Sequence, residues 1–288
     1  MSQTLMDVQF FAHRGNDMIK QISLAVALSW AAGVAADPVP LQPTAAGTAP
    51  DAILGTAGEP LGESVHYFPD DPQTIGYLAE PAGPGPHGAV VLIHDWYGLR
   101  DRIRQTADAL AAEGYVALAA DMYRGRTGST PEENRPLMME SLEDPSVMVR
   151  NLDAAVSYLK ARDDITGKVA AMGWCYGGGV ALSFALGSEN HEGTAIFYGR
   201  LVDDPERLKS IHHEIYGTFG QMDTRPSPEE VHAFVAAMRA AGIDNDVHIY
   251  DDVGHGFWLY VEQDPKNRLE PAIDAWDRLK AYLERTIR

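Results

Sequence analysis

A short glycine-rich segment constrains this chain more than any other part of its sequence. The segment Gly173-Trp174-Cys175-Tyr176-Gly177-Gly178 contains the single cysteine and follows the apolar run 168–172. An apolar run, a small residue, a nucleophile and a second small residue are typical of the sharp strand-to-helix turn called a nucleophile elbow. Gly173 and Gly177 would permit the strained backbone, and the turn would aim Cys175 at the N–H groups of the next helix, which can bind an oxyanion. The segment therefore predicts an α/β fold with nucleophilic chemistry; the alternative is a buried, unreactive thiol.

A nucleophile in this setting needs a carboxylate and then a histidine from later in the chain. Asp223 follows a strand-like apolar run, and His255 lies between two glycines soon after another such run. Because active sites of open α/β sheets gather at the carboxyl ends of the strands, both residues would arrive where Cys175 is displayed. We therefore predict a triad of Cys175, Asp223 and His255. The competitors are, for the carboxylate, Asp251 and Asp252 and, for the base, His248.

Apolar patterns elsewhere predict a mostly parallel sheet flanked by helices. The segment Ser227-Pro228-Glu229-Glu230 has the form of a capping box with proline at the first helical position, and it predicts a helix that runs to Ala241. The other expected elements are strands at 90–93, 115–119 and 247–250, a strand within 215–223 that runs out into a loop at Asp223, and helices over about 102–113, 149–159, 180–186 and 272–283.

These motifs and several further segments resemble the dienelactone hydrolase family of the α/β-hydrolase superfamily, over about residues 64–287. The matching parts are VLIHDWYGL at 91–99, GYVALAADMY at 114–123, the elbow at 173–178, IFYG at 196–199, Asp223 and GHGF at 254–257. A cysteine nucleophile in a framework that otherwise carries serine favours this family over ordinary esterases. The resemblance implies an α/β-hydrolase fold and hydrolysis of an ester or a lactone.

The resemblance also implies auxiliary groups around the nucleophile. In relatives, an acidic residue after the first central strand is held near the resting thiol and helps to take its proton. Asp95 occupies that position, where a glutamate is more usual. The backbone N–H groups of Trp96 and Tyr176 would form the oxyanion hole, in which one donor contributes on the order of 10²–10³-fold to turnover.

Relatives that act on dienelactone hold its carboxylate with two arginines. One of them follows the Asp-x-Tyr segment, where this chain has Arg124 and Arg126, and the other position holds Leu259. The resemblance therefore implies a less acidic and more apolar substrate than dienelactone. The expected substrate-binding residues are Tyr97, Arg124, Arg126, Tyr198, Phe257 and Leu259.

The expected reaction begins with attack of the Cys175 thiolate on an ester or lactone carbonyl. The resulting thioester is hydrolysed by water that His255 activates. The reaction needs no cofactor, and no metal site is expected because the chain has neither an H-E-x-x-H motif nor paired cysteines. One alternative is a general carboxylesterase or thioesterase with the same triad. Another is a hydrolase-fold protein that binds a ligand without turnover.

The composition restricts the partners. A formal net charge of −18 argues against nucleic acid and anionic membranes as partners. The expected partner is the small-molecule ester or lactone that the resemblance implies, and we expect a monomer or small homo-oligomer. A single cysteine excludes an internal disulfide framework.

The first sixty residues predict export followed by a linker. Lys20, the apolar run 22–34 and a small-residue segment ending at Ala36 have the layout of a secretory signal, and the run is too short to span a membrane. We expect an extension plus signal over 1–36, a flexible linker over 37–60 and a catalytic domain over 61–288. The protein would be periplasmic or secreted, or cytoplasmic if the signal does not function; an uncleaved anchor or an ordinary apolar helix is the alternative.

Overall fold

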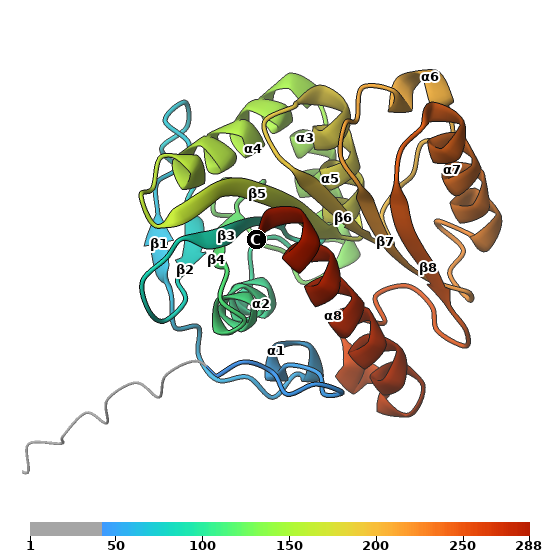
Figure 1. Cartoon of the computed structure of the whole chain (residues 1–288), viewed down its shortest axis with the longest axis horizontal. Helices are drawn as coiled ribbons and strands as arrows, with labels where there is room; N and C mark the ends of the chain where they lie inside the picture. The colour runs from blue at the N-terminus through green and yellow to red at the C-terminus, as the bar shows by residue number, and fades with distance from the viewer. Residues whose placement is uncertain (1–41) are drawn as a thin grey trace, which may run out of the picture. The chain divides into compact units, whose positions relative to one another are not determined.

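A central eight-stranded β-sheet organises the computed structural model, which describes residues 42–288 (Figure 1). The predicted signal sequence lies outside the described residues. The strand order is β1-β2-β4-β3-β5-β6-β7-β8. Strand β2 pairs antiparallel with both β1 and β4, and all the other neighbouring strands pair in parallel. The strands are β1 Glu63–Val65, β2 Gly76–Ala79, β3 His87–Ile93, β4 Val116–Ala120, β5 Ile165–Trp174, β6 Gly193–Phe197, β7 Ile215–Gly220 and β8 Asn245–Tyr250.

Helices flank both faces of this sheet (Figure 1). Helices α2 and α8 pack on one face, and α4 and α5 pack on the other. The helices are α1 Asp51–Leu54, α2 Asp101–Ala112, α3 Pro131–Ser141, α4 Pro145–Lys160, α5 Tyr176–Gly187, α6 Pro205–Leu208, α7 Pro228–Ala241 and α8 Pro265–Ile287, with a 3-10 turn η1 at Val261–Gln263.

The central strands are apolar on both sides because both faces are covered. In β3, Val90 and Leu92 face the α2 and α8 layer, whereas Val91 and Ile93 face the α4 and α5 layer. This alternation follows from the pleat, which points successive side chains to opposite faces. The two cores hold the carboxyl ends of β3 to β7 at one edge, where the loops can carry chemistry.

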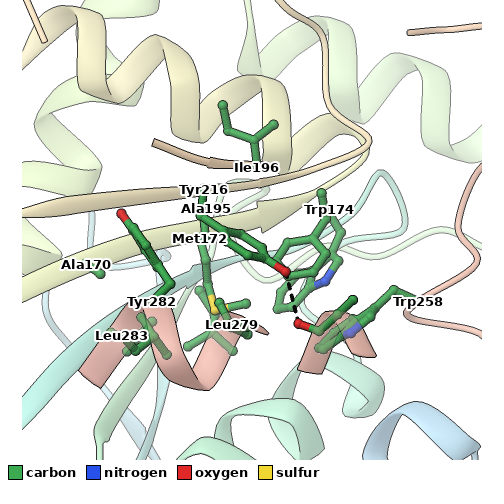
Figure 2. Packing of buried hydrophobic residues seen from close by; sticks show 14 of the residues in the cluster. Ala170, Met172, Trp174, Ala195, Ile196, Tyr216, Trp258, Leu279, Tyr282 and Leu283 are labelled. Carbon is green, nitrogen blue, oxygen red and sulfur yellow. Dashed lines mark hydrogen bonds between the residues drawn. The ribbon is translucent and has the colours of Figure 1, made fainter. Parts of the chain in front are cut away.

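The larger core joins α8 to the sheet through aromatic side chains (Figure 2). Trp174 at the end of β5 stacks on Trp258 with ring centroids 5.7 Å apart. The hydroxyl of Tyr216 donates to the carbonyl of Ala275 in α8 at 3.0 Å, which satisfies a polar atom inside this core. The residue before the predicted nucleophile is therefore rigidly anchored.

The predicted strands and helices are confirmed, with ends shifted by a few residues. The capping box is confirmed as well: the backbone N–H of Glu230 donates to the Ser227 hydroxyl at 3.3 Å, and the N–H of Ser227 donates to the Glu230 carboxylate at 2.7 Å. Helix α7 begins at Pro228, as its sequence predicts.

The flexible linker expected over 37–60 is wrong for much of its length. Ala49 and the short helix α1 pack into the same core as α2 and α8, and Ile53 has no exposed surface. The side chain of Arg102 in α2 donates to the carbonyl of Ala52 at 2.6 Å. The abundant proline, glycine and alanine suggested a linker, but burial of a few apolar side chains outweighs that local composition. The catalytic domain therefore begins upstream of residue 61.

Within residues 42–288, no helix is both long enough and apolar enough to cross a membrane.

Candidate active site

Cys175 occupies a strained turn between β5 and α5. Its backbone torsions are φ 56° and ψ −115°, in a region that residues with a side chain rarely adopt. A Cβ on Gly173 would lie 2.3 Å from the carbonyl oxygen of Gly177, and a Cβ on Gly177 would lie 2.2 Å from that of Ile93. Only glycine fits at these two places, so the segment has the geometry of the expected elbow. The thiol is half-buried and therefore accessible, unlike the inert thiol of the alternative.

Asp223 and His255 form a hydrogen-bonded pair at the same edge of the sheet. Oδ2 of the buried Asp223 lies 2.7 Å from Nδ1 of His255, and Oδ1 accepts from the backbone N–H of Arg225 at 2.9 Å. Because a carboxylate only accepts, Nδ1 carries the proton and donates it to Asp223. Nε2 is then the ring nitrogen that is left for the sulfur of Cys175.

The surroundings of His255 favour its cationic form. Burial acts to lower its pKa, but the hydrogen bonds and charges of Asp223 and Cys175 outweigh burial and raise the pKa to about 10. The ring also packs edge-on against Tyr198, with centroids 5.0 Å apart. A cationic imidazole beside a thiol is the arrangement that stabilises a thiolate.

The competing residues lie elsewhere. Asp251 and Asp252 are exposed in the turn after β8, and among the described residues neither is a partner of His255. His248 lies inside β8, where its ring packs 4.3 Å from that of Tyr250. The structure brings Asp223, and neither of its rivals, to His255.

Two backbone N–H groups near Cys175 are unused. Trp96 follows β3 and Tyr176 begins α5, and within the described part of the chain neither N–H donates to a protein acceptor. The two segments touch, because a Cβ on Gly177 would lie 2.4 Å from the carbonyl oxygen of His94. Both N–H groups are therefore unpaired within the described residues, and the assignment of oxyanion donors that the family resemblance implies stays a prediction.

Asp95, which directly precedes Trp96, is buried, and each of its carboxylate oxygens accepts a hydrogen bond. Oδ1 accepts from the backbone N–H of Tyr97 at 3.0 Å, and Oδ2 accepts a hydrogen bond from the hydroxyl of Tyr260. Arg100 lies over the ring of Tyr97 at 4.1 Å and reaches the Tyr260 hydroxyl at 3.5 Å. No sequence motif marks Arg100 or Tyr260 as a site residue, although each lies in a loop that also carries a predicted site residue.

The expected substrate-binding aromatic residues have different surroundings. Tyr97 lies partly exposed on the loop after β3, whereas Tyr198 is buried against His255 and supports its ring. Phe257 and Leu259 have no exposed surface and belong to the larger core. This corrects the expectation that the latter two line the pocket, because an apolar segment beside a core is more stable when it is buried.

The two candidate arginines are already neutralised. Arg124 forms an ion pair with Asp71 at 2.6 Å, and Arg126 forms a bidentate pair with Glu140 at 2.7 and 2.9 Å. Arg126 also lines a cleft of about 390 Å³ whose lining residues exclude the triad. The structure therefore corrects the expectation that these side chains are available for a substrate carboxylate.

In residues 42–288, no three side chains among histidine, cysteine, aspartate and glutamate gather closely enough to hold a metal ion.

Comparison with known proteins adds a family to this geometry. The model of the dienelactone hydrolase family matches residues 75–287. The chain belongs to the dienelactone hydrolase family. A Methylorubrum extorquens protein named "Putative carboxymethylenebutenolidase" is 28% identical over 274 residues, which cover 90% of each chain. An Aquifex aeolicus protein of the same name is 30% identical over 233 residues, which cover 78% of this chain and 100% of the relative.

Solved structures with little sequence identity share the fold. A dienelactone hydrolase-like promiscuous phosphotriesterase from metagenomic libraries has a TM-score of 0.69 at 22% identity, over 80% of this chain and 100% of that one. An esterase of Thermogutta terrifontis has a TM-score of 0.58 at 18% identity, over 78% and 95%. The predicted α/β-hydrolase fold is thus confirmed, and the protein is a dienelactone hydrolase-like hydrolase.

Proposed function

We propose that this hydrolase cleaves an ester or lactone bond through Cys175, His255 and Asp223, with a thioester intermediate. The observation that carries the proposal is the strained elbow that presents Cys175 to a histidine already paired with a buried aspartate. This arrangement supplies a nucleophile, a general base and a group that orients the base.

The first half of the reaction transfers the acyl group to sulfur. The Cys175 thiolate adds to the carbonyl carbon, and the carbonyl oxygen becomes an oxyanion against the N–H groups of Trp96 and Tyr176. The intermediate then collapses, the carbon–oxygen bond of the ester breaks, and the leaving alkoxide takes a proton from Nε2 of His255. With a lactone, the new hydroxyl group remains part of the bound acyl chain.

The second half hydrolyses the thioester. His255, now neutral, accepts a proton from water, and the hydroxide adds to the thioester carbonyl at the same oxyanion site. The carbon–sulfur bond breaks, which regenerates the thiolate beside the imidazolium and releases the carboxylate product. Asp223 keeps its hydrogen bond to Nδ1 throughout and holds the ring in one orientation.

Trapping the intermediate tests this proposal. The wild type is mixed with an activated aryl ester, quenched in acid and digested with trypsin. Mass spectrometry of the peptide 169–200 then shows whether Cys175 carries an acyl adduct. The wild type should show an adduct that decays at the rate of turnover, and Cys175→Ala should show neither adduct nor turnover. Turnover by Cys175→Ala would refute the triad.

We propose that the substrate is neutral or aromatic and lacks a recognition carboxylate. Leu259 is buried, and Arg124 and Arg126 are paired with carboxylates of the protein itself. A carboxylate-bearing substrate would have to displace one of these pairs, so a matched neutral ester should have an equal or higher kcat/KM. A strong preference for the acidic member of such a substrate pair would contradict this proposal.

The same substrate panel separates the alternatives. Preference for simple alkyl esters or acyl thioesters over lactones would favour a general carboxylesterase or thioesterase with this triad. Tight binding without turnover of any substrate would favour a ligand-binding role, which the complete set of nucleophile, histidine and aspartate argues against.

We also propose export, on the sequence alone, because the signal-like segment lies outside the described residues. Cleavage near Ala36 would make Asp37 the first residue of the mature protein. N-terminal sequencing of the protein from a bacterial host tests this, and a retained Met1 or Met18 in the soluble fraction would contradict it.

A further inference from the structure

The direction of the Trp96 N–H depends on a tight turn that begins at Asp95. The carbonyl oxygen of Asp95 accepts from the N–H of Gly98 at 3.3 Å, and its Oδ1 accepts from the N–H of Tyr97 at 3.0 Å. Both bonds span the peptide of Trp96. Nδ1 of His94 lies 2.6 Å from the same carbonyl oxygen, which belongs to the peptide unit of the Trp96 N–H. The Asp95 carboxylate therefore acts together with His94 to hold the direction in which the Trp96 N–H points.

Tyr260 holds that carboxylate from a distant part of the chain. Its hydroxyl donates to Oδ2 of Asp95 across 165 residues of sequence, and its backbone N–H donates to Gly256 O at 3.3 Å, next to His255. The contact thus joins the loop that carries the histidine to the loop that carries the oxyanion donor.

Two arginines fix the direction of the Tyr260 hydroxyl. Nη2 of Arg100 approaches its oxygen at 3.5 Å, so the hydroxyl accepts from Arg100 and its only proton points to Asp95. The guanidinium of Arg102 lies 5.4 Å from the centre of the Tyr260 ring and donates to the carbonyl of Leu259 at 3.1 Å, which restrains the ring.

We propose that Tyr260 is a positioning residue, which holds Asp95 so that the turn at 95–98 presents the Trp96 N–H to the oxyanion. The inference rests on the proposed function and extends it. Each carboxylate oxygen of Asp95 accepts one hydrogen bond within the protein, and we assign to Asp95 the role of holding this turn. His255 is the base of the proposed reaction, and this differs from the role that the family resemblance implies for the acidic residue.

The test removes the hydroxyl alone. Tyr260→Phe should lower kcat by about 10- to 100-fold and should leave KM within about twofold. This loss of kcat is no larger than that expected when one oxyanion donor is removed completely, which is about 10²–10³-fold. The alkylation rate of Cys175 by iodoacetamide should stay within about twofold of wild type, because the His255 and Asp223 pair is untouched. Arg100→Met, which only weakens the orientation of the hydroxyl, should lower kcat by about threefold.

A matched control loses the same kind of bond elsewhere. The hydroxyl of Tyr77 in β2 donates to Asp108 in α2 at 2.6 Å, so Tyr77→Phe also removes a tyrosine–aspartate hydrogen bond. This variant should keep the wild-type kcat even where its thermal stability falls. Asp95→Asn should lower kcat as Tyr260→Phe does, and the double variant should lose little more than either single one.

Each contrary result has a distinct meaning. Wild-type kcat in Tyr260→Phe, or an equal loss of kcat in Tyr77→Phe, would overturn the positioning role. A parallel fall of alkylation and kcat would overturn it too, because Tyr260 would then act on the thiol. Turnover by Cys175→Ala in the same assay would instead refute the proposed function.

Discussion

Two clusters with histidine lie toward opposite ends of the parallel strands. Beyond the carboxyl ends, His255 makes its 2.7 Å hydrogen bond with the carboxylate of Asp223. Near the amino end of β6, the hydroxyl of Thr194 lies 3.0 Å from Nε2 of His191 and 2.8 Å from Nε2 of His213. The first histidine has an anionic partner, and the other two share a neutral one.

The difference in partner leaves His191 and His213 neutral and makes His255 cationic near neutral pH. Burial lowers the pKa of His191 to about 3 and that of His213 to about 4, and a neutral hydroxyl cannot compensate for the lost hydration of a cation. Burial also opposes the charge of His255, yet Asp223 and Cys175 raise its pKa to about 10. The charge of Glu192 also acts to raise the pKa of His213, but it does not outweigh burial. The comparison shows that a buried histidine becomes cationic when an anion is hydrogen-bonded to its ring, as Asp223 is to His255.

The largest effect should separate the two clusters by function. Cys175→Ala and His255→Ala should each lower turnover by about 10⁴-fold or more, because each removes a group that takes part in the reaction. His191→Phe should change turnover little. Steady-state kinetics measure turnover, and circular dichroism checks that the variants fold. Wild-type turnover in His255→Ala would contradict the functional difference between the two clusters.

A second prediction sharpens the boundary between the reactive edge and the core behind it. Leu259→Arg should destabilise the protein by about 3–5 kcal/mol, because it places a charge without a partner where the leucine has no exposed surface. Leu259→Met should cost less than about 1.5 kcal/mol. Urea unfolding measures both. A folded Leu259→Arg that prefers acidic substrates would instead return this residue to the pocket.

A third prediction converts the partner of His255 from an anion to a neutral group. Asp223→Asn should lower turnover by about 10²-fold or more and should lower the pKa of His255, because the charge that raises it is gone. An NMR titration of the His255 ring reports the pKa directly. The exposed Asp252→Asn is the control and should match wild type; an unchanged His255 pKa in Asp223→Asn would show that Asp223 does not set its protonation.

The smallest effect concerns acid stability at the other cluster. In the unfolded chain, His191 and His213 titrate near their ordinary pKa of 6.5, whereas their folded pKa values are about 3 and 4. Between these values the unfolded state binds more protons, so stability is full above about pH 6.5 and falls by up to about 1.4 kcal/mol per pH unit for each histidine as the pH drops.

His191→Phe tests this, because phenylalanine keeps the stacking on Phe184, whose ring centroid lies 4.4 Å from that of His191. The variant should lose less stability than wild type between pH 6 and pH 4 in urea unfolding series. An identical acid slope in both proteins would mean that His191 does not titrate on unfolding.

Local patterns made the framework of the site predictable. The strand ends before Cys175 and Asp223 and the capping box at Ser227 are short-range features that a few neighbouring residues determine. The chain order of the triad then followed from the fold, since the strands deliver their loops to one edge. The structure pairs Asp223 with His255, and the part of Cys175 as their nucleophile stays a prediction.

Long-range contacts were not predictable. No local sequence pattern indicates which distant segments come into contact. Examples are the ion pair of Arg124 with Asp71, the burial of Ile53 and the hydrogen bond from Tyr260 to Asp95. The proline-rich composition predicted a linker where α1 packs into the core. The family resemblance implied a pocket position for Leu259, but Leu259 also packs into this core.

The sequence by itself indicated the sheet, the elbow and Cys175 as the proposed nucleophile, because an apolar run followed by a nucleophile between small residues predicts this strand-to-helix turn. Tertiary structure selected Asp223 over Asp251 and Asp252 as the partner of His255, and it alone decided which arginines are neutralised and what holds Asp95. The physical reason is range: backbone strain acts between neighbours in the chain, whereas charges and hydrogen bonds act between whatever side chains the packed cores bring together.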